Sequence, residues 1–156
     1  EKGILPLDGD GFNVVVLRPP MIYGKGSRGN YPVLSNLARK LPVFPKVDNE
    51  RSMLYIENLC EFVRLMVDNE ESGIFWPQNG EYSNTSHLVK LIAAAHGKKV
   101  HLVRGFGWAL KLISHVTGLV NKAFGSLSYD MEMSEYHCDY RVKSLEDSIK
   151  ETEVHE

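Results

Sequence analysis

Apolar runs separated by polar turns predict alternating strands and helices along most of the chain. The first run, FNVVVL at residues 12–17, is almost continuously apolar and β-branched, which is typical of a strand buried on both faces of a parallel sheet. Further strands are expected at 43–44, 53–56, 73–76 and 100–103, and helices at 32–40, 57–69, 88–96, 108–117 and 145–152. This order predicts an α/β fold in which the strands at 12–17 and 73–76 share a parallel sheet.

The segment after the first strand combines a strand stop with a glycine-rich stretch. Arg18 is followed by Pro19 and Pro20, which have no backbone N–H and cannot continue a central strand. Residues 20–30 hold three glycines and few apolar side chains, so they are predicted to form a loop at the carboxyl end of the strand. Ligands bind at this end of the strands in open α/β sheets.

Composition excludes several classes of protein. The 156 residues are 43% hydrophobic and 24% charged with a net charge of -2, which is ordinary for one soluble globular unit. Near-neutral charge without a basic block gives no reason to expect nucleic acid as a partner. Cys60 and Cys138 lie far apart and predict reduced thiols in a cytoplasmic protein. The first residue is Glu1 rather than Met, which suggests a fragment or an excised domain.

No membrane partner is expected, because no apolar run approaches the roughly 20 residues that a bilayer-spanning helix requires. The most apolar candidate, residues 106–120, contains Lys111, Ser114, His115 and Thr117. It predicts an amphipathic helix that packs on a core.

Two motifs at a suitable separation suggest a family. Residues 17–24 read LRPPMIYG, and residues 51–59 read RSMLYIENL. The first resembles the Arg-Pro-x-x-(Val/Ile)-Tyr-Gly segment that ends the sixth core strand of extended short-chain dehydrogenases/reductases acting on nucleotide sugars. The second resembles their Arg-Asp-(Phe/Tyr)-x-Tyr-Val-Asp-Asp-(Leu/Val) segment. The similarity covers residues 12–103 well and extends loosely to the last helix.

The resemblance implies a role for each matching residue. Arg51 would bind the diphosphate of a UDP-sugar, and a planar guanidinium suits phosphate oxygens. Asn30 would bind near the phosphates at the start of a helix, where free N–H groups favour an anion. Val43 and Phe44 would contact the uracil, although Phe44 could equally be a core residue. Met21 would line the sugar site, and Pro19, Pro20 and Ile22 would lie beside the nicotinamide of NAD or NADP.

Catalytic and metal-binding residues are not expected in this chain. The family's Gly-x-x-Gly-x-x-Gly and Tyr-x-x-x-Lys motifs are absent, and in the family both precede the segment matched here. The chain by itself is therefore predicted to be inactive, with the cofactor bound mainly by an N-terminal half. Tyr23 and Tyr55 are interpreted as packing residues. The six histidines include no close pair with a carboxylate at zinc spacing.

The resulting hypothesis divides the chain in two. Residues 1–30 would end a Rossmann-type sheet and supply the active-site loop, and residues 31–156 would form mainly a nucleotide-sugar-binding lobe, with a strand near 73–76 returning to the sheet. The parent would be a homodimeric UDP-sugar 4-epimerase of polysaccharide biosynthesis. Met21 replaces an Asn of the galactose epimerase pattern, and Ser52 replaces the usual Asp. Two alternatives stay open: a quinovosamine-type UDP-sugar 4-keto reductase, and a non-catalytic nucleotide-binding domain.

Overall fold

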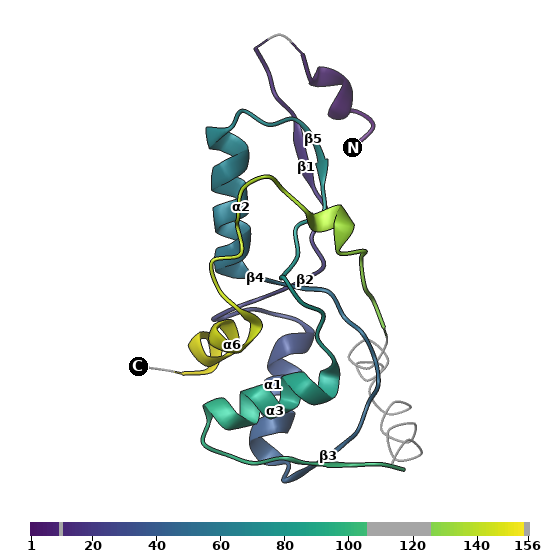
Figure 1. Cartoon of the computed structure of the whole chain (residues 1–156), viewed down its shortest axis with the longest axis vertical. Helices are drawn as coiled ribbons and strands as arrows, with labels where there is room; N and C mark the ends of the chain where they lie inside the picture. Colours follow the sequence, from purple (N-terminus) through teal and green to yellow (C-terminus); the bar gives the residue numbers. More distant parts are fainter. Residues whose placement is uncertain (10, 106–125, 155–156) are drawn as a thin grey trace.

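The structure, a computed structural model, describes residues 1–9, 11–105 and 126–154 (Figure 1). Its strands are β1 (Val15–Leu17), β2 (Met21–Tyr23), β3 (Val43–Pro45), β4 (Met53–Tyr55), β5 (Gly73–Phe75) and β6 (His101–Val103). Its α-helices are α1 (Asn30–Lys40), α2 (Ile56–Asp68), α3 (Thr85–Ala95) and α6 (Leu145–Glu153), and its short 3-10 helices are η1 (Leu5–Leu7) and η2 (Glu132–Ser134). The strands and helices predicted in these parts of the chain are therefore present, and the α/β class is confirmed.

The strands form three parallel pairs: β1 with β5, β2 with β4, and β3 with β6. The pairing of β1 with β5, with Val16 opposite Ile74, confirms that the strands predicted at 12–17 and 73–76 lie side by side. β1 is shorter than predicted because its N-terminal part forms a turn. Phe12 pairs with Gly9 through two backbone hydrogen bonds of 3.0 Å, and the Val14 N–H donates to the Asp8 side chain at 2.8 Å.

The prediction that residues 20–30 form a loop is wrong for Met21–Tyr23. These residues form β2, whose Met21, Ile22 and Tyr23 lie opposite Met53, Leu54 and Tyr55 of β4. Pro20 stops β1, but it does not prevent the residues after it from pairing with a different strand, because each of them has its own N–H. The true loop is the shorter glycine-rich segment 24–29.

Strand β4 separates two hydrophobic cores. All three of its side chains are buried, and because side chains alternate across a strand, Met53 and Tyr55 face one core and Leu54 faces the other. The first core joins α1, α3 and α6 to β2 and β3, and the second joins α2 to the β1–β5 pair. Figure 1 shows α1 and α3 at one end of the molecule, β1, β5 and α2 at the other, and β2 with β4 between them.

Local sequence signals set the helix ends. The Asn84 side chain accepts a hydrogen bond from the His87 N–H at 2.7 Å at the start of α3, and Gly97 has a φ of 67° after its end. The Ser144 hydroxyl oxygen likewise accepts from the Asp147 N–H at the start of α6. The helix predicted within 106–120 lies outside the described residues.

The described residues also bear on membrane insertion and on the state of the cysteines. There, no helix has both the length and the apolar character needed to cross a membrane. Cys60 and Cys138 are both free thiols.

Gly24, which follows β2, is required by close packing. A Cβ atom at this position would lie 2.5 Å from Cγ2 and 3.1 Å from Cβ of Ile56, and neither atom is the far end of a flexible side chain. We predict that Gly24→Ala lowers the free energy of unfolding by about 1–3 kcal/mol, the range for overpacking. Urea denaturation measures the loss. Gly3→Ala is the control because a Cβ at Gly3 meets nothing within 4 Å; equal effects of the two substitutions would contradict the packing argument.

Candidate functional site

Arg51 lies between two other segments of the chain. Its N–H donates to the Ser83 carbonyl at 2.8 Å, and its own carbonyl accepts from the Ser83 N–H at 3.0 Å. On the other side it forms a parallel bridge with Leu127, where the Ser52 N–H donates to the Leu127 carbonyl at 3.0 Å. The Ser52 hydroxyl, which stands in place of the Asp of the motif, accepts from the Tyr129 N–H at 2.9 Å. These bonds fix the backbone direction of residue 51.

The register of β2 against β4 relates Arg51 to the end of β1. Met21 lies opposite Met53 in this parallel pair, so Pro19 and Arg51, each two residues earlier, enter the pair at the same end. The proline-rich exit of β1 and the residue proposed to bind phosphate are therefore at the same end of one strand pair. Ligands in open α/β sheets bind at the carboxyl ends of the strands, and both segments border that end of β1.

The Arg51 side chain is buried, with 5% of the residue exposed. Burial lowers the pKa of its guanidinium from the ordinary value, because desolvation disfavours the charged form. The pKa of Arg is ordinarily so high that the group stays protonated near neutral pH. Arg51 is thus a positive charge in a poorly solvated position, where an interaction with an anion is stronger than at the surface.

The N-terminus of α1 has features that suit an anion. Gly29 occupies the cap position with a φ of 95°, no side chain caps the helix, and no acidic residue lies in the first turn. Asn30 is the first helical residue and is half-buried. The first N–H groups of α1 therefore lack a side-chain cap, and the helix dipole there favours negative charge.

The residues predicted to contact a base lie on β3. Val43 is 47% exposed, whereas Phe44 is 2% exposed and belongs to the core formed with α1 and α3. Among the described residues β3 has one strand neighbour, β6. Because the Phe44 ring is enclosed, the group that this strand can offer to a base is its backbone, with Val43 beside it.

The residues predicted to lie beside a nicotinamide form the start of β2 and the turn before it. Pro20 is buried, Pro19 and Met21 are half-buried, and Ile22 is 38% exposed. The segment combines apolar side chains with two prolines that lack N–H groups. It can form an apolar wall for a flat ring or a sugar face.

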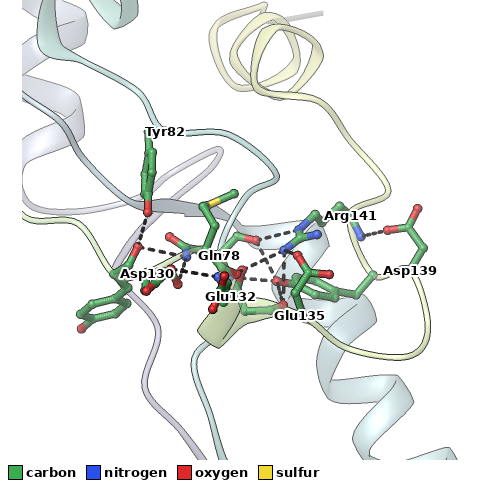
Figure 2. A network of polar contacts seen from close by, with 11 residues as sticks. Gln78, Tyr82, Asp130, Glu132, Glu135, Asp139 and Arg141 are labelled. Carbon is green, nitrogen blue, oxygen red and sulfur yellow. Dashed lines mark hydrogen bonds and ion pairs between the residues drawn. The ribbon is translucent and has the colours of Figure 1, made fainter.

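Sequence reasoning missed a polar cluster around Gln78, drawn in Figure 2. Gln78 follows β5 and is almost fully buried. Its backbone N–H donates to the Tyr140 hydroxyl at 3.1 Å, and its side-chain amide donates to the Asp130 carbonyl at 3.0 Å. The signal in the sequence is weak, since Pro77-Gln78-Asn79-Gly80 reads as an ordinary turn and the partners of Gln78 are about 50 to 60 residues away.

A second buried cluster centres on Asn79. Its side-chain oxygen accepts from the Tyr55 N–H at 3.0 Å and from the Asn58 amide at 3.1 Å, and its own amide donates to the Tyr23 hydroxyl at 3.0 Å. Tyr23 also shares a hydrogen bond with Ser148 of α6. Burial raises the pKa of Tyr23 and raises that of Tyr55 to about 12. Both tyrosines belong to the first core, in agreement with their interpretation as packing residues.

No group of three or more potential metal ligands occurs among the described residues.

Comparison with known proteins relates this arrangement to one family. No family model matches the chain. The chain is 26% identical to a curated UDP-glucose 4-epimerase of Vibrio cholerae, over 97% of this chain and 49% of the relative. Among solved structures, a human epimerase family protein with NADPH has a TM-score of 0.63 at 15% identity, covering 94% of this chain and 50% of that one. The Bordetella bronchiseptica enzyme WbmG, in complex with NAD and UDP, has a TM-score of 0.54 at 14% identity, covering 91% and 44%.

The sequence match and the shared fold agree with the two motifs. The chain is similar in sequence to a UDP-glucose 4-epimerase and has the fold of a solved epimerase family protein. This confirms the resemblance and the Rossmann-type fold expected from it. The chain spans about half the length of the curated relative that it matches.

The stabilising effect of the second buried cluster can be tested by a substitution of Asn79. Asn79→Ala leaves the buried Tyr55 N–H without its acceptor and removes the donor to Tyr23. We predict a loss of more than about 2 kcal/mol in the free energy of unfolding, since each unsatisfied buried group costs about 1–3 kcal/mol. Chemical denaturation measures it. Asn36→Ala, at an exposed position of α1, should change stability by less than about 0.5 kcal/mol. A loss at Asn79 no larger than that at Asn36 would refute this assignment.

Proposed function

We propose that this chain is the substrate-binding part of an NAD(P)-dependent UDP-sugar 4-epimerase that acts through a 4-keto intermediate. The observation that carries the proposal is the position of Arg51. Its backbone is fixed between Ser83 and Leu127, at the same end of the β2–β4 pair as the proline-rich exit of β1. Sequence similarity to a UDP-glucose 4-epimerase supports the choice of substrate class.

In this proposal the diphosphate binds between Arg51 and the N-terminus of α1. Arg51 supplies a permanent positive charge in a poorly solvated position, and α1 supplies uncapped N–H groups with Asn30 as its first residue. The uracil lies along β3, where the backbone around Phe44 recognises its polar edge and Val43 contacts its face. Each of these elements is anchored in the first core, so the binding groups are held by rigid secondary structure.

The sugar ring would lie against the wall formed by Pro19, Pro20, Met21 and Ile22. Pro19, Pro20 and Ile22 would lie beside the nicotinamide of NAD(P), and the cofactor, when bound, would supply the hydride chemistry at C4 of the sugar. The part of this chain is to hold the diphosphate and to provide an apolar surface that excludes water from the reacting face. The described residues offer no Tyr-x-x-x-Lys pair for the proton of the C4 hydroxyl, so we propose that the catalytic acid/base and the glycine fingerprint belong to a cofactor-binding half.

The incomplete sheet supports a division into two halves. The β1–β5 pair is a two-stranded parallel sheet, and parallel sheets are stable when both faces are covered. Beside β1 lies a cavity of about 640 Å³, lined on its apolar side by Val15, Leu17, Val63, Met66 and Val67. Val67 of α2 is 71% exposed. We propose that this surface packs against further strands and helices of the cofactor-binding half.

Calorimetric titration of UDP into the full-length protein tests the phosphate assignment. We predict that Arg51→Ala weakens binding by about ten- to hundredfold, because a charge-assisted hydrogen bond contributes about 1.5–3 kcal/mol. The affinity of Arg51→Lys for UDP should lie between those of wild type and Arg51→Ala, since Lys keeps the charge but lacks the planar guanidinium. Arg64→Ala is the matched control, because Arg64 is exposed on α2 and pairs there with Glu61 and Asp68. An affinity within about twofold of wild type for Arg51→Ala means that Arg51 does not bind the phosphates.

The reaction itself separates the candidate functions. A 4-epimerase interconverts two UDP-sugars that differ at C4 without net consumption of NAD(P)H, whereas a 4-keto reductase oxidises one NADPH for each 4-keto sugar reduced. A non-catalytic binding domain does neither. We predict net interconversion by the full-length protein, measured by chromatography of the UDP-sugars. Stoichiometric NADPH oxidation with a 4-keto sugar and no interconversion would favour the reductase.

A further inference from the structure

The segment 126–134, here named the strap, lies beside Arg51. The Leu127 N–H donates to the Glu50 carbonyl at 3.1 Å, and the Tyr129 N–H donates to the Ser52 hydroxyl. Ser126, Leu127 and Ser128 are all exposed, so apolar burial contributes little to holding this part of the strap. Its position must come from polar contacts.

Two side chains from the segment 78–83, which pairs with Arg51 through Ser83, donate hydrogen bonds to the strap. The Tyr82 hydroxyl donates to the Tyr129 carbonyl at 2.8 Å, and the Gln78 amide donates to the Asp130 carbonyl at 3.0 Å and to the Tyr129 carbonyl at 3.4 Å. Tyr82 directly precedes Ser83, which pairs with Arg51. These two side chains, here named the clip, therefore join the two segments that flank Arg51. Figure 2 shows both pointing toward the carbonyls around Asp130.

The backbone of Gln78 is itself fixed by hydrogen bonds with Tyr140 and Arg141. The Tyr140 hydroxyl bonds to the Gln78 N–H and carbonyl, and the Arg141 Nε–H donates to the same carbonyl at 3.2 Å. Arg141 also donates to the Ser134 hydroxyl at 2.8 Å, at the far end of the strap. Its guanidinium lies over the Tyr140 ring at 4.9 Å. The clip thus starts from a buried residue whose backbone N–H, backbone carbonyl and side-chain NH2 are all hydrogen-bonded, and it can hold the strap in one place.

We propose that Gln78 and Tyr82 are positioning residues that set the direction of the Arg51 side chain through the strap. Arg51 sits in the middle of three segments, and the clip links the outer two across it. If the clip opens, Leu127 and Ser52 can shift, and the Arg51 side chain between these segments is no longer held in one position for the proposed diphosphate. This inference rests on the proposed function, because it assigns the clip to the same phosphate site without contact between the clip and the ligand.

A double-mutant cycle tests this role. In the full-length protein, Tyr82→Phe removes one hydroxyl and should weaken UDP binding about three- to tenfold, the effect of one neutral hydrogen bond. In an Arg51→Ala background the same substitution should have no further effect, because the clip acts through Arg51. A purely structural role predicts the same fold loss in both backgrounds. Gln78→Met, which removes the amide donor, serves as a second variant and should behave in the same way.

Tyr136→Phe is the matched control. Tyr136 is also half-buried and its hydroxyl also donates, to Glu71 at 2.7 Å, but it packs in the second core. It should leave the affinity for UDP unchanged. If Arg51→Ala weakens binding and Tyr82→Phe does not, or if the Tyr82 effect persists unchanged without Arg51, this inference is overturned while the proposed function stands. If the wild-type protein does not bind UDP, or if Arg51→Ala binds as tightly as wild type, the proposed function fails and this inference with it.

Discussion

The parallel pairing of β2 with β4 is the constraint on which the rest of the structure depends. Met21, which follows the two prolines after β1, lies opposite Met53, the first residue of β4. Arg51 precedes β4 by two residues, so the pairing brings the end of β1 and Arg51 to the same end of the strand pair. It also puts β4 between the two cores, so that a single strand connects the sheet end of the molecule with the helical lobe. A shift of one residue in this register would exchange the two faces of a strand whose side chains are all buried, and burial on both faces therefore specifies the register strongly.

Buried amides hold this strand pair in place. Asn79 bonds to the backbone of β4, to Asn58 at the start of α2 and to Tyr23 at the end of β2, and Asn58 exchanges two hydrogen bonds with the backbone of Lys143 before α6. Such groups are costly to bury unless they are paired, and here each pairs with a different element. The network therefore specifies how helices and strands from distant parts of the chain meet, a task that apolar packing performs less selectively.

The two ends of the molecule differ in how much of their apolar surface is covered. The helical lobe encloses its core on several sides, with α1, α3 and α6 packed against β2 and β3. The β1–β5 end has an open apolar surface along β1 and α2. The proposed substrate-binding lobe, with its own core and joined to the edge of a larger sheet, would account for both observations. It also agrees with a match to about half of the UDP-glucose 4-epimerase relative.

The sequence by itself determined most of the described element types, the α/β class and the family resemblance, because apolar periodicity, caps and the two motifs are local signals. The tertiary structure alone decided that Met21–Tyr23 form a strand, since a partner more than 30 residues away supplies the pairing. It also decided that the Phe44 ring is enclosed and that Arg51 is fixed between Ser83 and Leu127. The buried hydrogen bonds of Gln78 and Asn79 could not be predicted from the sequence, because only folding brings their distant partners within hydrogen-bond distance.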